Sequence, residues 1–171
     1  KFYARIGQSL GDATTILEAG EDQLAKEPVF FSRHLWTTRP GVALQINAFN
    51  FPSWGLWEKI AVATIAGAPS MAKPATATAW LSHEMMRDVI AAGIVPAGVF
   101  NVIPSSQSAK VGEILCASEK VAKLTFTGST RVGKILMRQG AETIKKLSLE
   151  LGGNAPFIVF DDADVDAAVE G

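Results

Sequence analysis

A single carboxylate stands at the end of an apolar run and directly before two glycines, in the segment 147–153 (LSLELGG). The residues before Glu150 are typical of a strand, and the glycines remove side chains where the backbone bends or another group approaches. A carboxylate held there is expected to lose solvation, which would suit it to act as a general base. An ordinary glutamate at a strand end is the alternative, and this segment alone supports both interpretations equally.

A second candidate is the segment 126–133 (FTGSTRVG), which joins a predicted strand to a predicted helix. Its glycines allow close approach, Ser129 can cap the helix, and the first N–H groups of a helix have no partner within it. Such a turn is suited to bind a phosphate. The segment lacks the GxGxxG spacing of common dinucleotide-binding turns, and a simple helix cap is the alternative.

Asn50 and Lys73 also follow predicted strands. The amide N–H of Asn50 could stabilise a developing oxyanion, and the ammonium of Lys73 could bind ribose hydroxyls or a phosphate. The alternatives are a turn asparagine that bonds its own backbone and a solvated lysine at a strand end.

Other reactive side chains are few. Cys116 is the only cysteine, and its place within an apolar helix segment predicts an inert core residue, not a nucleophile. His34 and His83 lack the spacing of metal ligands, so we predict no metal site. A single cysteine also excludes an internal disulfide framework and indicates a reducing compartment, here taken as the cytoplasm.

The elements that must position these residues alternate along the chain. The helices are predicted at 54–66, 78–92, 108–117 and 131–140, and the strands at 42–47, 70–73, 99–103, 121–127 and 146–150. Five strands separated by four helices predict an α/β fold with a Rossmann-like open parallel five-stranded sheet and helices on both faces. Ligands of such sheets bind outside the carboxyl ends of the strands, where the candidate residues lie.

Before this alternation, the spacing of apolar residues predicts a helix over 3–23, with Gly11 as a weak point, and an extended arm over 29–38. The 171 residues are 48% hydrophobic and 19% charged, which is typical of a globular chain with a core. The net charge of −1 gives no basic field for nucleic acid or an anionic membrane. No apolar run approaches the roughly 18 residues of a membrane span. Both ends look cut, so we expect a piece of a longer protein.

Four motifs together resemble the NAD(P)-dependent aldehyde dehydrogenase superfamily, and they occur in that family's order. They are 49–52 (FNFP), 73–74 (KP), 126–130 (FTGST) with Gly133, and 149–153 (LELGG). The resemblance spans nearly the whole chain. It implies that Asn50 is the side-chain half of an oxyanion hole and that Glu150 is the base that activates water for deacylation.

The same resemblance implies a set of cofactor contacts. Lys73 would hold the adenosine ribose and Ser129 would lie at the pyrophosphate. Thr76 stands where many NAD-preferring members carry a glutamate that bonds the ribose 2′-OH and repels a 2′-phosphate. The cofactor is therefore expected to be NADP, with NAD as the alternative. The further expected cofactor-binding residues are Phe49, Gly128, Val132, Leu151 and Gly152.

In the family, a cysteine thiolate attacks the aldehyde, a hydride passes to nicotinamide and water releases the acid. That cysteine follows the Glu-Leu-Gly-Gly segment, so its counterpart is expected past Gly171, and Cys116 does not match it. The resemblance divides the chain into an N-terminal helix and arm (1–40), a dinucleotide-binding domain (41–153) and the start of a catalytic domain (154–171). The chain alone is expected to be inactive. The expected partners are a small aldehyde and, in a homo-dimer or homo-tetramer, further copies that contact the arm.

Two parts of the chain resemble different subfamilies. Residues 41–78, with 45–52 (QINAFNFP) and Glu58-Lys59, resemble semialdehyde dehydrogenases of aromatic-acid breakdown, which act on CoA-thioester semialdehydes. Residues 154–171 resemble succinate-semialdehyde dehydrogenases, which carry an arginine where this chain has Glu58. The loop 105–108 (SSQS) departs from the glycine-bearing loop of many relatives. The alternatives left open are a CoA-acylating relative, which would not need Glu150, and a non-catalytic nucleotide-binding module.

Overall fold

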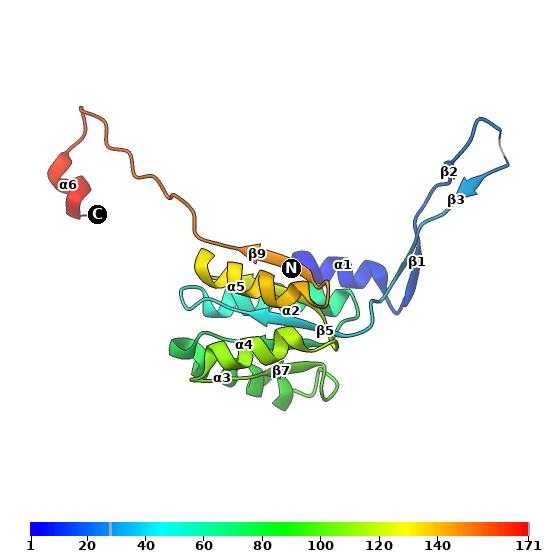
Figure 1. Ribbon diagram of the computed structural model, residues 1–171, viewed down its shortest axis with the longest axis horizontal. Coiled ribbons are helices and arrows are strands. Elements are labelled where there is room, and N and C mark those ends of the chain that lie inside the picture. The colour runs from blue at the N-terminus through cyan, green and yellow to red at the C-terminus, as the bar shows by residue number, and fades with distance from the viewer. Residues whose placement is uncertain (28, 171) are drawn as a thin grey trace.

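The computed structural model describes residues 1–27 and 29–170. Its centre is a sheet of five parallel strands in the order β7-β6-β5-β8-β9 (Figure 1). The strands are β5 (Val42–Ile46), β6 (Ser70–Lys73), β7 (Phe100–Val102), β8 (Val121–Thr127) and β9 (Lys146–Glu150). The predicted parallel sheet is confirmed.

Four helices cover the two faces of this sheet. They are α2 (Pro52–Ile65), α3 (Ala79–Ala91), α4 (Ser108–Ala117) and α5 (Thr130–Ala141), and the short 3₁₀ turn η1 (Thr76–Thr78) precedes α3. Helices α2 and α3 pack on one face, and α4 and α5 pack on the other. Proline fits the first turn of α2 because that turn leaves its N–H groups unpaired within the helix. The predicted covering of both faces is confirmed.

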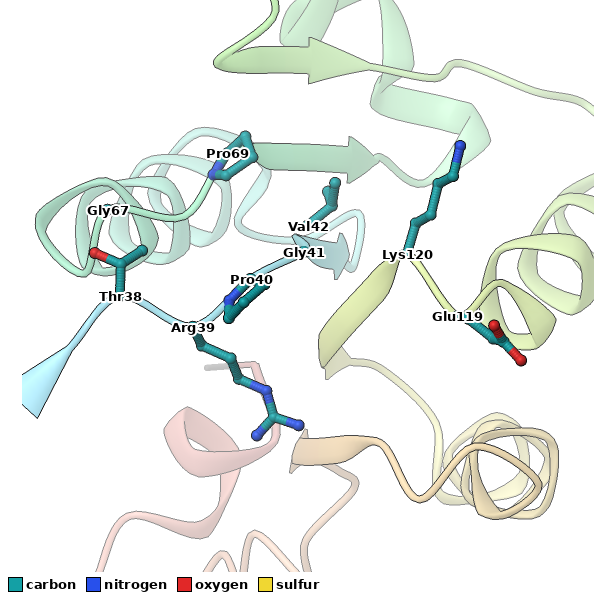
Figure 2. A pocket seen from close by; sticks show the side chains of 9 residues that line it. All are labelled: Thr38, Arg39, Pro40, Gly41, Val42, Gly67, Pro69, Glu119 and Lys120. Atoms are coloured by element: carbon teal, nitrogen blue, oxygen red, sulfur yellow. The ribbon is translucent and has the colours of Figure 1, made fainter.

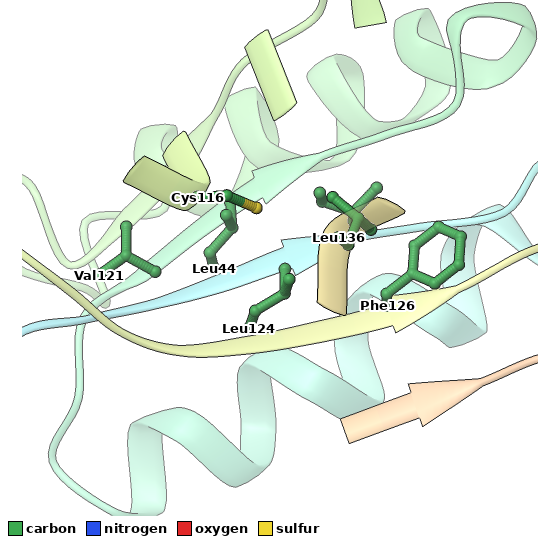
Figure 3. Close-up of a cluster of buried hydrophobic side chains, with 7 residues drawn as sticks. Leu44, Cys116, Val121, Leu124, Phe126 and Leu136 are labelled. Atoms are coloured by element: carbon green, nitrogen blue, oxygen red, sulfur yellow. The ribbon is translucent and has the colours of Figure 1, made fainter. Parts of the chain in front are cut away.

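The larger core cluster lies between the sheet and the α4/α5 layer. Leu44 of β5 and Leu124 of β8 are fully buried there, against Cys116 of α4 and Leu136 of α5 (Figure 3). Burying each leucine contributes about 1.5–3 kcal/mol, so this layer holds the two central strands in register. Cys116 is 0% exposed, as expected of a core residue.

The second cluster lies on the other face, where Leu56 and Ile60 of α2 meet Ala72 of β6 and Met86 of α3. Because neighbouring strand residues point to opposite faces, Gln45 and Asn47 share this second face while Leu44 and Ile46 face the first. The α2/α3 face therefore carries buried polar side chains close to the carboxyl end of β5.

The order of the strands creates a switch point. The chain goes from β5 outward through β6 to β7, and then returns to form β8 on the other side of β5. In open α/β sheets the crevice at this reversal, outside the carboxyl ends of the strands, is where ligands bind. Residues that follow β5 and β8 are therefore placed at the expected site.

The N-terminal region differs from its prediction. Helix α1 covers only Phe2–Leu10, and the predicted helix over 3–23 is wrong beyond it. Gly11 turns the chain with a φ of 56°, and the β-branched residues that follow form strand β1 (Thr15–Leu17) instead. Strand β1 pairs antiparallel with β4 (Leu35–Thr37), and β2 (Asp22–Gln23) pairs with β3 (Phe31–Ser32).

These four short strands form an arm that projects away from the sheet (Figure 1). The predicted extended arm over 29–38 thus supplies one strand to each of two small antiparallel sheets, whose other strands begin at residue 15.

At the other end of the chain, residues 151–160 follow β9 without regular structure and lead to the short helix α6 (Val165–Glu170) (Figure 1).

A shallow cavity of about 620 Å³ lies at the amino ends of β5 and β8 (Figure 2). Its lining includes Arg39, Gly41, Glu119 and Lys120. The candidate residues lie at the carboxyl ends of the strands, on the side of the sheet opposite this cavity.

None of the helices within the described residues is long and apolar enough to cross a membrane. Residues 1–27 and 29–170 also hold no cluster of three or more side chains suited to bind a metal.

Candidate nucleotide-binding and catalytic site

The start of α5 and the end of β9 are in contact. The backbone N–H of Gly128 donates a hydrogen bond of 3.0 Å to the carbonyl oxygen of Glu150. A Cβ on Gly133 would come within 2.5 Å of Leu151, so a glycine is needed for this close packing of helix on strand. A Cβ on Gly152 would lie 3.5 Å from Thr130 Oγ1. The structure therefore brings the predicted residues Gly128, Glu150, Leu151 and Gly152 together.

Ser129 caps α5, because its Oγ accepts a hydrogen bond of 3.3 Å from the backbone N–H of Val132. The first turn of this helix contains no acidic residue. Its N-terminal N–H groups and the positive end of its dipole are therefore available to an anion at the edge of the sheet. The cap and the phosphate-binding interpretation of this turn are compatible with each other.

The Glu150 side chain is exposed, so the expectation that it loses solvation is wrong. The physical reason is its position on β9, which has a neighbouring strand on one side only. Beyond Gly152 the chain runs away from the sheet (Figure 1), and residues 153–160 are exposed. The carboxylate therefore lies at the carboxyl ends of the strands, as predicted, but it is in contact with water.

Lys73 is different, because it is only 3% exposed at the end of β6. Its Nζ donates a hydrogen bond of 2.8 Å to the carbonyl oxygen of Pro74. Within the described residues no carboxylate lies within ion-pair distance of this ammonium. Burial lowers the pKa of Lys73 from its ordinary value. The alternative of a solvated lysine is therefore wrong.

Thr76 lies in the turn after Lys73, near the end of β7. Its Oγ1 donates a hydrogen bond of 3.0 Å to the carbonyl oxygen of Ser105 and lies 3.2 Å from Ser108 Oγ. The loop 105–108, which departs from the pattern of relatives, is thus tied to the turn after β6. The side chain at this position is a neutral hydroxyl group, and it is held by the loop after β7.

Phe49 and Asn50 lie in the loop between β5 and α2, and both are exposed. Phe51 and Trp54 close this loop by an edge-to-face contact with ring centroids 5.5 Å apart. The Asn50 side chain makes no hydrogen bond to any of the described residues, so it is not occupied by its own backbone. No hydrogen bond joins Asn50 to Glu150 among the described residues, although both lie where strands of the sheet end at their carboxyl side.

The structure adds Asn47 and Lys59, which the sequence motifs leave without a role. Lys59 Nζ, from α2, donates a hydrogen bond of 3.0 Å to Oδ1 of Asn47. Burial lowers the pKa of Lys59, while the negative charges of Glu58 and Glu150 oppose that shift. Lys59 follows the buried Leu56 by three residues, which places both on the helix face that packs on the sheet. That spacing is the signal by which the sequence could have identified it.

The strand order with its switch point and the helices on both faces define an open sheet of the doubly wound α/β class. The model of the aldehyde dehydrogenase family matches residues 14–171. The chain belongs to the aldehyde dehydrogenase family.

Individual relatives agree with this assignment. The chain is 52% identical over 131 residues to a succinate-semialdehyde dehydrogenase (NADP(+)) of Escherichia coli and 49% identical over 131 residues to a succinate semialdehyde dehydrogenase of Acinetobacter baylyi. Each match covers 77% of this chain, but only 27% of the relative. A crystal structure of an NADP-dependent enzyme of Escherichia coli superposes with a TM-score of 0.73 at 43% identity, covering 98% of this chain and 33% of that one. The chain thus spans about a quarter of the length of the curated relatives it matches.

The residues present fit a dinucleotide with phosphate groups. An ammonium buried without a carboxylate partner among the described residues suits hydroxyl or phosphate oxygens. The missing side chains of Gly128 and Gly133 permit close packing at the start of α5, and Ser129 orders its first turn. These features support the cofactor contacts that the motifs imply.

Proposed function

We propose that this chain is the cofactor-binding part of an aldehyde dehydrogenase that oxidises a semialdehyde to a carboxylic acid with NADP. The observation that carries the proposal is the Lys73 ammonium, which is buried where β6 ends and has, among residues 1–27 and 29–170, the Pro74 carbonyl as its hydrogen-bond partner. A charge buried in this way is costly unless a ligand uses it. The resemblance carried by the motif 73–74 supports its assignment to the adenosine ribose of a bound dinucleotide.

Each cofactor-binding residue has its own task in this proposal. Ser129 and the N–H groups that begin α5 hold the pyrophosphate, and Lys73 holds the ribose. Thr76 leaves the 2′ position free of negative charge, which supports NADP over NAD. Phe49, Gly128, Val132, Leu151 and Gly152 complete the cofactor contacts.

Binding of the two cofactors to the purified 171-residue chain tests this directly by calorimetry. NADP is expected to bind at least as tightly as NAD. NAD binding that is tenfold tighter would contradict the assigned preference, and no binding of either cofactor would contradict the proposed function. The matched variant Thr76→Glu should shift the preference toward NAD, because it restores a carboxylate beside the 2′ position.

The catalytic assignments are Asn50 and Glu150. The Asn50 amide N–H is directed to the aldehyde oxygen as negative charge develops on it. Glu150 takes a proton from the water that releases the acid, and its exposure gives that water access. The chemistry that NADP supplies when bound is acceptance of a hydride at its nicotinamide ring.

Cys116 does not serve as the nucleophile in this proposal. It is 0% exposed in the α4 layer, and burial raises the pKa of its thiol, so the reactive thiolate is disfavoured. The thiolate that attacks the aldehyde must come from a part of the enzyme outside these 171 residues. Aldehyde oxidation is therefore to be measured on the complete enzyme, with the chain alone as the inactive comparison.

The substrate is proposed to be a bulky or CoA-linked semialdehyde. Glu58 of α2 is exposed near the Asn50 loop and would repel a second carboxylate on the substrate. The motifs of residues 41–78, which we interpret as similar to those of dehydrogenases of CoA-thioester semialdehydes, are the second ground for this proposal. Replacement Glu58→Arg in the complete enzyme should raise kcat/KM for succinate semialdehyde, and an unchanged or lower value would contradict this specificity.

We further propose a cytoplasmic homo-dimer or homo-tetramer, with the domain boundaries given above (1–40, 41–153 and 154–171). The arm supports this assembly, because its exposed apolar side chains include Leu17, Phe31, Leu35 and Trp36. Exposed apolar surface of this kind marks contact with another protein surface. Light scattering of the complete enzyme tests it, and a monomer would contradict the assignment.

A further inference from the structure

The arm consists of two small sheets that meet at a junction. The inner sheet pairs β1 with β4, and the outer sheet pairs β2 with β3 farther from the body of the molecule (Figure 1). Each strand of the outer sheet contributes only two paired residues, and an isolated two-stranded sheet is marginally stable in water. Contacts at the junction therefore decide how well the outer sheet is ordered.

His34 lies at this junction and approaches a carboxylate with each of its ring nitrogens. Its Nδ1 is 3.2 Å from Oε2 of Glu18, which follows β1, and its Nε2 is 3.8 Å from Oδ2 of Asp22 in β2. The backbone carbonyl of His34 also accepts a hydrogen bond of 2.9 Å from the Glu18 N–H. The imidazole therefore links the end of the inner sheet to the start of the outer sheet.

The protonation of the ring decides how many of these contacts it can make. An imidazolium has two N–H donors and can serve both carboxylates, whereas a neutral imidazole has one donor and one acceptor. A neutral ring that donates from Nδ1 to Glu18 turns the lone pair of Nε2 toward the Asp22 carboxylate, which repels it. Glu18 keeps another donor in both states of the ring, because Trp36 Nε1 lies 3.2 Å from its Oε2. The contact that depends on the proton is therefore the one between His34 and Asp22.

The other charged groups at the junction pair with each other. Arg33 Nε donates a hydrogen bond of 2.6 Å to Oε1 of Glu21. Among the described residues, Glu18 and Asp22 are the carboxylates within ion-pair distance of His34. A guanidinium and a carboxylate both keep their charges between about pH 5 and 8, so the pair of Arg33 and Glu21 holds the junction equally over this interval.

We propose that His34 is a pH-sensitive switch, which holds the outer sheet of the arm against the inner sheet when its imidazole is charged. Histidine is the side chain that ordinarily changes its charge between about pH 5 and 8. The outer sheet is therefore more ordered at the acidic end of this interval and less ordered as the pH rises. Because these groups are exposed, the contact with Asp22 changes the equilibrium by up to about fivefold.

Hydrogen exchange of the Leu24 amide measures the order of the outer sheet, because this N–H donates a hydrogen bond of 2.9 Å to the carbonyl oxygen of Phe30. NMR of the 171-residue chain is to compare its protection at about pH 5.5 and about pH 8, corrected for the intrinsic exchange rate. We expect protection to be about two- to fivefold lower at the higher pH. The Glu18 amide, which belongs to the inner sheet, is the internal reference and should change by less.

Four variants separate the switch from the rest of the junction. His34→Gln carries no charge, so Leu24 protection should be low at both pH values. Asp22→Asn should also remove the pH dependence, because its neutral amide can pair with either form of the ring. His34→Lys is charged at both values and should keep protection high at both. The matched control Glu21→Gln, which removes the partner of Arg33, should lower protection by the same factor at both values and keep the pH dependence.

Leu24 protection that does not change with pH in the unsubstituted chain would overturn the inference. A change of the same size in His34→Gln or in Asp22→Asn would also overturn it, since the proton would then act on another group.

The consequence for assembly rests on the homo-oligomer proposed above, in which the arm contacts further copies. Light scattering of the complete enzyme should give a dissociation constant between copies that is about two- to fivefold higher at the higher pH, and His34→Lys should remove this difference. An oligomer whose dissociation does not change with pH would overturn this consequence. A monomer at both pH values would contradict the proposed assembly alone, because the exchange of Leu24 does not depend on it.

Discussion

Lys73 gives the sharpest prediction, because stability and function should change in opposite directions. Replacement Lys73→Met keeps most of the unbranched stem that is buried at the end of β6 and removes the charge. In the unliganded chain the buried ammonium donates to the Pro74 carbonyl and has no carboxylate partner among the described residues. Lys73→Met should therefore stabilise the chain while it weakens cofactor binding.

The magnitude follows from two opposing effects of the substitution. Burying a charge costs several kcal/mol even after relaxation, and the methionine avoids that cost. Losing the charged hydrogen bond to Pro74 costs about 1.5–3 kcal/mol. We expect a net gain of about 1–2 kcal/mol in the free energy of unfolding, since the desolvation cost avoided exceeds the hydrogen-bond energy lost. For a chain of this size, such a gain raises Tm by about 2–8 °C.

The dependence on pH provides an independent check. The pKa of Lys73 is lowered in the folded chain, so between that value and 10.5 the unfolded chain binds the additional proton. The stability of the unsubstituted chain should therefore rise with pH across this interval. The advantage of Lys73→Met should be complete below the folded pKa and should shrink as the pH approaches 10.5.

Urea unfolding followed by tryptophan fluorescence measures the first effect, and calorimetric titration with NADP measures the second. The matched control is Lys120→Met, an exposed lysine at the amino edge of the sheet, which should change neither. A destabilised Lys73→Met, or one that binds NADP as tightly as the unsubstituted chain, would refute the reasoning.

Three further substitutions, the first with a matched control, test other features of the structure. Gly133→Ala should destabilise by about 1 kcal/mol, since a clash of 2.5 Å with Leu151 outweighs the gain in helix propensity; Gly112→Ala, with 3.9 Å of room, should stabilise instead in the same urea experiment. Ser129→Asp should keep the helix cap and leave Tm within a few degrees. Its affinity for NADP, measured by calorimetry, should fall because the new carboxylate repels phosphate. An unchanged affinity would contradict the proposal that this turn binds the phosphate. Cys116→Ala should destabilise at pH 7 through the cavity it leaves. The pKa of the folded thiol is raised, so the unsubstituted chain loses stability as pH rises above 9.0, and the difference between the two chains should narrow in urea melts at high pH.

The sheet could be predicted from the sequence because its signals are local. The limits of β6, β8, β9 and α4 agree with the prediction, since each has the apolar periodicity of its element and is bounded by glycine, proline or polar residues. Because the strands alternate with helices, most other sheet topologies are excluded, and a parallel sheet with helices on both faces is predicted. The order of the strands, and so the switch point, came from the structure.

The errors have tertiary causes. The apolar spacing before Gln23 fits a helix, but Gly11 takes a positive φ and β1 finds an antiparallel partner in β4, about 20 residues later. The solvation of Glu150 depends on whether anything covers the edge strand, which its neighbours in sequence do not reveal. Lys59 was missed because a lysine in a helix is usually solvated; its spacing from Leu56 indicates the packed face of α2, but only the fold places Asn47 opposite it.

The return of the chain from β7 to β8 has a consequence for synthesis on the ribosome. Ala43 of β5 pairs with Lys123 of β8, 80 residues later, but with Ser70 of β6 only 27 residues later. At about 5–20 residues per second, β5 therefore emerges roughly 4–16 s before its second neighbour exists. During that time the nascent chain holds an apolar strand with one open edge, which can pair with another nascent chain. The central strand of the finished sheet is thus the strand most in need of a chaperone while it is being made.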